Sequence, residues 1–190
     1  GMYVAGGFGW LDTWLLPVTD NEILRSLLFF GVLFIVSDLL NLPFDYYDTF
    51  VIEAKFGFNK TTPGLFLLDK LKSTLLMIVL GGGLLALIVW IYLLTSTYFW
   101  LLAFGVLTFF GLVMSMFYSE WIVPLFNKQT PLEAGELRTA ISSFAEKAGF
   151  KIDNIFVIDG SRRSTKANAY FSGLGPRKRI VLYDTLIAQM

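Results

Sequence analysis

The chain has 190 residues, of which 55% are hydrophobic and only 16% are charged, whereas soluble globular domains carry about 25% charged residues. Its 15 Lys and Arg residues balance 15 Asp and Glu residues, which argues against nucleic-acid binding because that needs an excess of positive charge. Cysteine and histidine are both missing from the sequence. Disulfides, Ser-His catalytic pairs and thiolate or imidazole metal sites are therefore excluded within this chain.

The first apolar segment, Ile23–Leu42, is long enough to cross a bilayer, which takes about 20 residues of helix. Trp10 and Trp14 precede it in a stretch typical of the membrane–water interface, where tryptophan is enriched. Asp38 is the one acidic residue within this predicted span. We expect Asp38 to snorkel to the surface or to pair with a lysine of the following loop, and a polar cavity is the alternative.

A second apolar stretch, without any charged residue, runs from Ser73 to Ser119. Its polar turn Thr95–Thr97 divides it into two predicted spans, residues 73–94 and residues 98–118. The loop 43–72 and the tail 119–190 hold most of the Lys and Arg residues, and two spans separate them, so both lie on the same side. The positive-inside rule places both in the cytoplasm. We therefore expect a membrane region over residues 1–118 and a cytoplasmic α+β part over residues 119–190.

The tail has the composition of a small α+β unit with one helix and about three short strands. Thr130–Glu133 resembles a capping box and predicts the start of a helix that ends at Gly149. The apolar face of this helix would carry Leu137, Ile141, Phe144 and Ala148. The predicted strands are residues 154–159, 167–172 and 179–184, with Gly173–Lys178 as a hairpin connection. The fold class is a multispanning α-helical membrane protein with a small α+β part that has too little core to stand alone.

Few residues of the tail offer chemistry of their own. A serine–lysine dyad around Ser161, Ser164 and Lys166 needs a lysine whose pKa is lowered by burial. Arg162 and Arg163 lie in the same charged run, so we interpret it as a solvated, exposed loop.

The strand Ala167–Ser172 is the sharpest functional feature. An edge strand offers unpaired backbone N–H and C=O groups to an extended peptide, and Asn168 adds an amide that both donates and accepts. The alternative is a plain strand with Tyr170 in the core, and residue chemistry alone favours that alternative.

Several stretches together resemble the type I CaaX prenyl proteases, which are multispanning zinc metalloproteases of the endoplasmic-reticulum and bacterial inner membranes. The resemblance runs in order from about Gly6 to the end of the chain. Its motifs are LPFDYY (42–47), FVIEAKFGFNK (50–60), PLFNKQTPLEAGEL (124–137), FVIDGSRRSTKANAYF (156–171) and RIVLYDTL (179–186).

The resemblance implies a membrane zinc endopeptidase that cleaves an extended peptide or protein substrate, prenylated or not. In the family, an H-E-x-x-H helix and a downstream glutamate hold the zinc, which activates water. The family's substrate-binding strand corresponds to Asn168, Ala169 and Tyr170 here. Lys166 and Ala167 depart from it, because many members have a histidine and a small polar residue at these positions.

A chain without histidine lacks the zinc helix, so the resemblance implies a central fragment of an incomplete metalloprotease domain. We expect the zinc helix beyond Met190, no catalytic or metal-binding residue in this chain, and no proteolysis by the chain alone. The alternative is a catalytically inactive membrane scaffold or binding protein with the same fold. A channel or transporter is disfavoured because the spans are almost uncharged. The expected partners are the substrate and the lipid bilayer, without nucleic acid.

Overall fold

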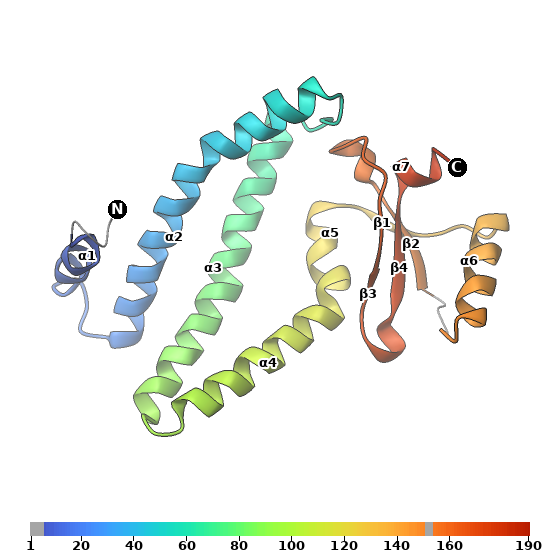
Figure 1. The fold of residues 1–190 in the computed structure, drawn as a ribbon. Coiled ribbons are helices and arrows are strands. Elements are labelled where there is room, and N and C mark those ends of the chain that lie inside the picture. Colours follow the sequence, from blue (N-terminus) through green and yellow to red (C-terminus); the bar gives the residue numbers. More distant parts are fainter. Residues whose placement is uncertain (1–5, 151–153) are drawn as a thin grey trace. The chain divides into compact units, whose positions relative to one another are not determined.

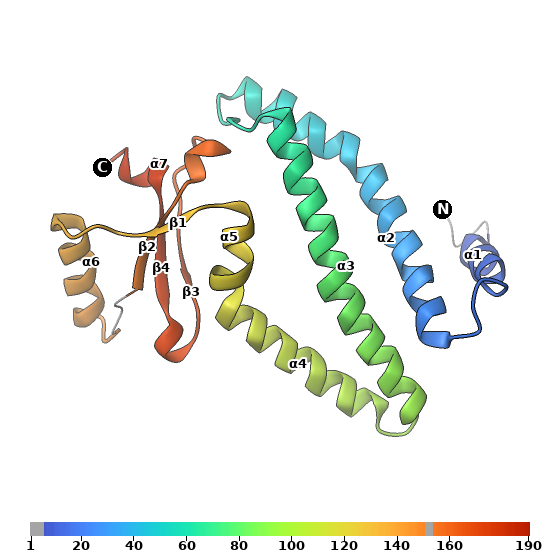
Figure 2. The ribbon, with the colours of Figure 1, turned by 180° about the vertical axis from the view of Figure 1, so that it is seen from behind.

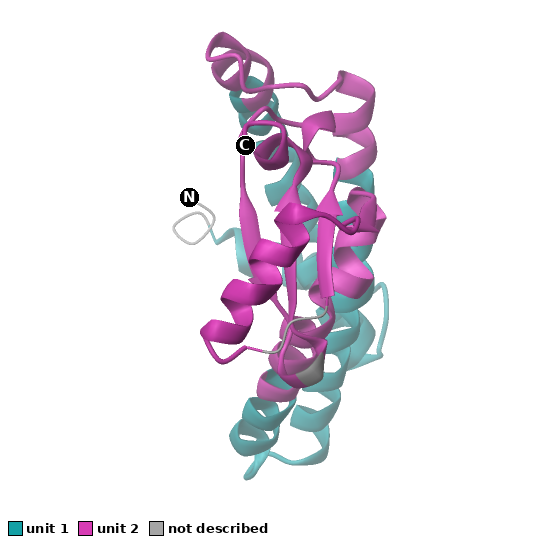
Figure 3. Cartoon of the chain, turned by 90° about the vertical axis from the view of Figure 1, so that its right-hand side faces the viewer, with its two compact units in different colours: residues 1–48, 70–107 teal, residues 49–69, 108–190 magenta. Residues whose placement is uncertain are grey.

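The computed structural model describes residues 6–150 and 154–190, and Figure 1 shows their helices and strands. The chain divides into two compact units, which Figure 3 distinguishes by colour. Residues 1–48 and 70–107 form unit 1, and residues 49–69 and 108–190 form unit 2. Each unit is described by itself below.

Unit 1 is helical. Its helices are α1 (Gly7–Leu15), α2 (Glu22–Tyr47), most of α3 (Pro63–Leu94) and the first half of α4 (Phe99–Phe117). Asn21 caps α2, since its side chain accepts a hydrogen bond from the Leu24 N–H at 2.9 Å. In Figures 1 and 2, α2 and α3 lie side by side.

A helix covers each of the three predicted membrane spans. Within residues 6–150 and 154–190, the helices long and apolar enough to cross a membrane are Glu22–Glu53, Pro63–Leu94 and Phe99–Phe126. The predicted turn after residue 94 is confirmed, because α3 ends at Leu94 and α4 begins at Phe99. Helix α3 has 32 residues and is about 48 Å long at 1.5 Å per residue. It therefore exceeds a hydrocarbon core of about 30 Å, so charged residues in its first turns need not enter that core.

Asp38 pairs with a lysine, which is one of the outcomes that the sequence predicted. The Lys70 Nζ lies 2.8 Å from the Asp38 Oδ1 and 2.9 Å from the Asp45 Oδ2. Thr74 donates a hydrogen bond to the second oxygen of Asp38 at 3.2 Å. The lysine belongs to helix α3 rather than to a loop, so this network ties α2 to α3.

Unit 2 contains a four-stranded mixed sheet in the order β1-β2-β4-β3. Its strands are β1 (Gln129–Pro131), β2 (Asn154–Ile158), β3 (Ala169–Ser172) and β4 (Arg179–Tyr183). β2 and β4 are parallel, whereas the β1–β2 and β3–β4 pairs are antiparallel. The three predicted strands are confirmed, and β1 is an additional strand.

The sheet is covered on both faces, as the nearly edge-on views of Figures 1 and 2 show. Helix α6 (Glu136–Lys147) covers one face, where Ala145, Ile155 and Leu182 form a buried cluster. Helix α5 (Val123–Phe126) covers the other face, where Val123 packs with Ile158 and Val181. The side chains of Val181 and Leu182 pack on opposite faces of the sheet, because successive side chains of a strand point to alternate faces.

Besides the first turns of α3 and the second half of α4, unit 2 has several short elements. They are the π-helical turns η1 (Asp48–Glu53, whose first residue belongs to unit 1) and η2 (Tyr118–Ile122), the 3₁₀ turns η3 (Gly160–Arg162) and η4 (Gly175–Arg177), and helix α7 (Asp184–Ile187). The predicted hairpin connection between β3 and β4 is confirmed and contains η4.

The predicted start of α6 is wrong. Thr130 lies in β1 opposite Val157, and α6 begins only at Glu136, after Gly135. The Thr130 backbone belongs to the sheet, so its side chain does not cap the helix. The predicted face is correct for Leu137 and Ile141, which pack against the cluster on that face of the sheet.

The predicted apolar face of α6 is wrong beyond Ile141. Phe144 is 74% exposed, whereas Ala145 is buried, because a 3.6-residue period continues from position 141 to position 145 as well as to 144. Ala148 lies just past the helix, and Gly149 follows it with φ +77°, as expected of a glycine that ends a helix.

Candidate functional site

Strand β3 lies at one edge of the sheet. Its residues pair with β4 in an antiparallel register that sets Ala169 opposite Leu182 and Phe171 opposite Ile180. Among the residues that the structure describes, no strand pairs with the other side of β3. We call that side the free edge of β3.

The register decides which backbone groups face the free edge. The Tyr183 N–H donates to the Asn168 carbonyl at 3.0 Å, so Asn168 belongs to a hydrogen-bonded pair. In an antiparallel ladder these pairs alternate with pairs whose N–H and C=O groups point away. Tyr170 therefore bonds toward β4, whereas Ala169 and Phe171 turn their backbone groups toward the free edge.

Asn168 caps part of this edge. Its Oδ1 accepts a hydrogen bond from the Ala169 N–H at 2.9 Å, so the first outward donor is already used. Phe171 is 50% exposed, and its outward backbone groups have no partner within residues 6–150 and 154–190. The structure thus brings Asn168 and Ala169, two of the predicted substrate-binding residues, to the free edge.

Tyr170, the third predicted residue, turns its side chain into the core of unit 2. Its hydroxyl lies 3.4 Å from the Ser119 Oγ, and Gln129 donates to the Ser119 Oγ at 3.2 Å and to the tyrosine hydroxyl at 3.4 Å. Ser119 is only 1% exposed. Burial raises the pKa of the Tyr170 hydroxyl above its ordinary value, and the bond to Ser119 partly offsets this. The Tyr170 side chain therefore anchors β3 to η2 and β1.

A short segment of the 43–72 loop pairs with the residues that precede β3. Asn59 forms an antiparallel bridge with Ser164. The Lys60 N–H donates to the Arg163 carbonyl at 2.9 Å, and the Thr165 N–H donates to the Phe58 carbonyl at 3.0 Å. This segment therefore belongs to the surroundings of the free edge.

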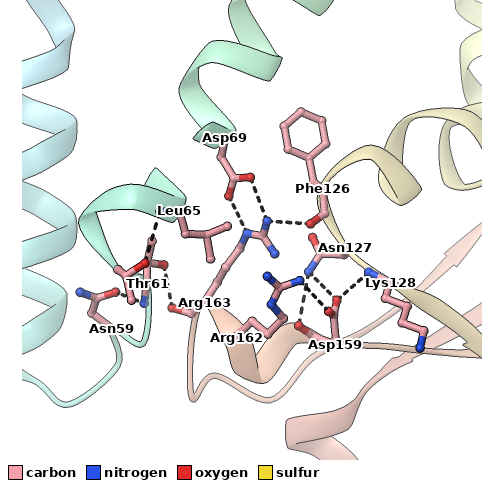
Figure 4. Close-up of polar contacts among 11 residues, drawn as sticks. Asn59, Thr61, Leu65, Asp69, Phe126, Asn127, Lys128, Asp159, Arg162 and Arg163 are labelled. Carbon is pink, nitrogen blue, oxygen red and sulfur yellow. Dashed lines mark hydrogen bonds and ion pairs between the residues drawn. The ribbon is translucent and has the colours of Figure 1, made fainter. Parts of the chain in front are cut away.

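Arg163 joins three parts of unit 2, as Figure 4 shows. Its guanidinium donates to both carboxylate oxygens of Asp69 at 2.8 and 2.9 Å, and to the Phe126 carbonyl at 2.7 Å. The two charged side chains are 21% and 20% exposed. The expectation that Arg163 is solvated is wrong, because a carboxylate far away in the sequence partners it.

Asp159 completes the connection from β2 to β3. Its Oδ1 accepts from the Lys128 N–H at 2.8 Å and from the Asn127 side chain at 3.2 Å. The chain is thus fixed on both sides of the η3 turn. Sequence reasoning missed these residues because they lie on separate elements.

The serines and the lysine of the charged run are engaged elsewhere. The Ser161 hydroxyl bonds to Asp184, and its N–H donates to the same carboxylate at 2.8 Å. Lys166 forms an ion pair with Glu53 and lies 5.1 Å from the Phe58 ring centroid. Lys166 is 53% exposed, so the structure supports the exposed-loop interpretation over a serine–lysine dyad.

A metal site of the type that this resemblance implies does not fit the residues present. The chain has no histidine or cysteine. In the part of the chain that the structure describes, no group of three or more acidic residues is arranged to hold a metal ion. We therefore derive no catalytic step through zinc from these residues.

Two family models match the chain. The model described as "CAAX prenyl protease N-terminal, five membrane helices" matches residues 1–128, and "Peptidase family M48" matches residues 131–190. The chain belongs to the CAAX prenyl protease family. The resemblance and the expected fold class are thereby confirmed, and the protein is an integral membrane protein of a metalloprotease family.

Curated members of the family are similar over most of this chain. The CAAX prenyl protease 1 homolog of Oryza sativa subsp. japonica is 46% identical over 170 residues, which are 90% of this chain and 40% of that protein. CAAX prenyl protease 1 of Saccharomyces cerevisiae is 45% identical over 169 residues, or 88% of this chain and 37% of that protein. The chain spans less than half of the length of these relatives.

A solved structure of the family has the same fold. The crystal structure of S. mikatae Ste24p superimposes with a TM-score of 0.90 and 40% sequence identity, over 98% of this chain and 45% of that one. The likeness therefore covers the fold as well as the sequence. It supports the family assignment independently of the motifs.

Proposed function

We propose that this CAAX prenyl protease chain supplies membrane spans and the substrate-binding strand of a membrane zinc metalloendopeptidase. The observation that carries the proposal is the free edge of β3, where Ala169 and Phe171 turn their backbone groups away from β4. An edge strand of this kind binds an extended peptide by strand addition. Asn168, Ala169 and Tyr170 act as the substrate-binding residues.

These three residues and Phe171 contribute in different ways. The Ala169 carbonyl and both backbone groups of Phe171 bond to the peptide, and Asn168, whose Oδ1 already accepts from the Ala169 N–H, presents its side-chain NH2 group beside them. Tyr170 works through its anchor to Ser119, because that contact fixes the strand before the peptide arrives. A preorganised edge lowers the entropic cost of binding.

The substrate is a peptide or protein, and the names of the relatives point to a prenylated one. Zinc belongs to the complete enzyme, and under this proposal its ligands are supplied by residues other than these 190. This chain alone then has no zinc-dependent proteolysis. We place residues 43–72 and 119–190 on the cytoplasmic side of an endoplasmic-reticulum or bacterial inner membrane, as the positive-inside rule requires.

Amide hydrogen exchange tests the docking strand. The 190-residue chain is reconstituted in lipid nanodiscs and compared with and without a farnesylated peptide that ends in a CAAX sequence. The Phe171 amide should exchange more slowly with the peptide, while the amide of Val181 in the sheet interior should not change. An unchanged Phe171 amide at saturating peptide would refute docking on β3.

Peptide cleavage with added zinc tests the second part of the proposal. No turnover is expected from the 190-residue chain. Turnover that a chelator abolishes would show that the chain holds its own catalytic metal, and would overturn this part.

The alternative is a catalytically inactive membrane scaffold or binding protein with the same fold. The coding sequence after Met190 separates the two. An H-E-x-x-H motif there supports the enzyme, because its two histidines share one helix face, and a stop codon supports the scaffold.

A further inference from the structure

A pocket of about 470 Å³ lies within unit 1, between helix α1 and the N-terminal half of α2. Its lining combines one cation, Arg25, one anion, Asp12, and the three aromatic rings of Phe8, Phe29 and Phe30. A concave site with a few charged groups among apolar side chains is the usual form of a ligand site. The proposed docking of a peptide on β3 does not use this pocket, so its ligand is a separate question.

The residues around the pocket suit the level of the lipid headgroups. On α1, which lies beside the first part of α2 (Figure 1), Trp10 and Trp14 are exposed and stack with ring centroids 6.5 Å apart. Leu11 and Leu15 of the same helix are buried. An amphipathic helix with exposed tryptophans is typical of the membrane–water interface. Arg25 lies near the start of α2, where the first apolar span begins.

The two charges of the pocket lack a charged partner within residues 6–150 and 154–190. The Asp12 carboxylate and the Arg25 guanidinium form no ion pair there, with each other or with another side chain. Arg25 is half-buried, and a charge withdrawn from water is costly without a counter-charge. A ligand with one negative and one positive group would supply a partner to both. The headgroup of a zwitterionic phospholipid carries such a pair, a phosphate and an ammonium group.

The three rings favour one kind of ammonium group. The ring centroids of Phe8 and Phe29 are 6.4 Å apart, and those of Phe29 and Phe30 are 5.5 Å apart. Groups of aromatic rings recognise quaternary ammonium ligands such as choline. A choline group has no N–H donor, so rings and one carboxylate can satisfy it. We propose that this pocket binds the phosphocholine headgroup of a membrane lipid, with its phosphate at Arg25 and its choline group at Asp12 and the rings.

The proposed orientation of the chain agrees with a zwitterionic ligand. Helix α2 leads into the 43–72 loop, which we place in the cytoplasm, so the start of α2 and the pocket lie on the opposite side. The anionic lipids that attract basic segments belong mainly to the cytoplasmic leaflet. One arginine balanced by one aspartate, instead of a cluster of basic residues, fits a headgroup without net charge.

Native mass spectrometry of the 190-residue chain tests the site, in a detergent without a choline group. Equal amounts of phosphatidylcholine, phosphatidylethanolamine and phosphatidylglycerol with identical acyl chains compete for the protein. Phosphatidylcholine should bind about five- to tenfold more tightly than phosphatidylglycerol, which has no cation for Asp12 and the rings. Phosphatidylethanolamine should bind about two- to fivefold more weakly than phosphatidylcholine, because its strongly hydrated ammonium gains less from the rings.

Substitutions of the two charged residues link this preference to the pocket. Asp12→Asn should remove the preference for phosphatidylcholine over phosphatidylglycerol, whereas Asp20→Asn, at an exposed acid outside the pocket, should keep it. Arg25→Gln should weaken all three lipids about two- to fivefold, and Lys55→Gln, at an exposed lysine beyond the other end of α2, should weaken none. Equal effects of Asp12→Asn and Asp20→Asn would overturn the site, because net charge would then explain the preference.

The choline assignment has its own variant. Phe30→Leu keeps an apolar side chain at an exposed position and should lower the preference for phosphatidylcholine over phosphatidylethanolamine. Phe104→Leu is the matched control, since Phe104 is an exposed ring on α4 that does not line the pocket. Equal binding of phosphatidylcholine and phosphatidylethanolamine by the unaltered chain would overturn the choline assignment. Equal binding of phosphatidylcholine and phosphatidylglycerol would overturn the zwitterionic site as a whole.

Discussion

Asn168 places one side-chain oxygen on an otherwise open strand edge. Its hydrogen bond to the Ala169 N–H satisfies a donor that faces away from the sheet. Exposed edge groups invite pairing with other chains, and proteins commonly cover them. The residue therefore has a structural role in the unliganded protein besides its proposed role toward a peptide.

Asn168→Ala should accelerate hydrogen exchange of the Ala169 amide by about two- to tenfold, because a net hydrogen bond contributes about 0.5–1.5 kcal/mol. Asn168→Asp is the control, since it keeps an oxygen at the same place and should keep the protection. Exchange measured by mass spectrometry or NMR without peptide checks this. Equal protection in the Ala variant would show that the side chain does not cap this donor.

Arg163 and Asp69 form a partly buried, forked ion pair. Arg163→Ala leaves the carboxylate without its partner and should lower the free energy of unfolding by about 2 kcal/mol. Arg163→Lys should recover only part of this, because an ammonium does not reproduce the planar fork. Thermal unfolding in detergent measures both effects.

Arg162→Ala provides the matched control for that measurement. Arg162 is 56% exposed, and its contact with Asp159 is long, at 3.4 Å. Exposed pairs contribute about 1 kcal/mol or less, so the change should be within about 0.5 kcal/mol. An Arg163→Ala effect no larger than that of Arg162→Ala would contradict a structural role for the fork.

At the scale of helices and strands, the elements with strong local sequence patterns were predictable, and those with weak patterns were not. The membrane helices and strands β2 and β4 follow from uninterrupted apolar runs. Strand β1 has three residues, one of them proline, and no periodicity predicts it. Strand β1 forms because it pairs with the edge of β2. Thr130 therefore lies in a strand and does not act as the predicted helix cap.

The hairpin between β3 and β4 depends on Gly173. Its φ is +87°, and a Cβ at this position would lie 2.1 Å from the Arg177 carbonyl oxygen. Gly173→Ala should therefore destabilise unit 2 by about 2 kcal/mol or more, through both backbone strain and the clash. Gly175→Ala is the control, because Gly175 also has a positive φ of +56° but nothing lies near its Cβ position.

Gly175→Ala should cost about 1 kcal/mol, the backbone part alone. Unfolding midpoints of the two variants, together with exchange of the β3 amides, measure the difference. Equal midpoints would mean that the turn relaxes around the new methyl group.

For the whole molecule, the sequence predicts what lies close together along the chain and little of what lies far apart. Asp69 and Arg163 are 94 positions apart. The two acids and the lysine that tie α2 to α3 lie on separate helices. The spacing of residues along the sequence does not reveal such pairs. The free edge of β3 was predictable as a strand, but its exposure depends on the order of all four strands.

The predicted division into a membrane region 1–118 and a cytoplasmic part 119–190 is a statement about sidedness, and labelling tests it directly. The chain has no cysteine, so single cysteines can be introduced at Lys55, Ser96 and Lys147. One span, α3, separates position 55 from position 96, and two spans, α3 and α4, separate position 55 from position 147.

Lys55→Cys and Lys147→Cys should therefore react with a membrane-impermeant maleimide from the same side, and Ser96→Cys from the other. The comparison uses sealed vesicles of both orientations, with detergent-solubilised protein to show that each cysteine is reactive. Lys55 and Lys147 should label from the cytoplasmic side, since the basic segments are retained there. If Ser96→Cys labels together with Lys55→Cys, α3 does not cross the membrane, and the shared sidedness of the loop and the sheet loses its basis.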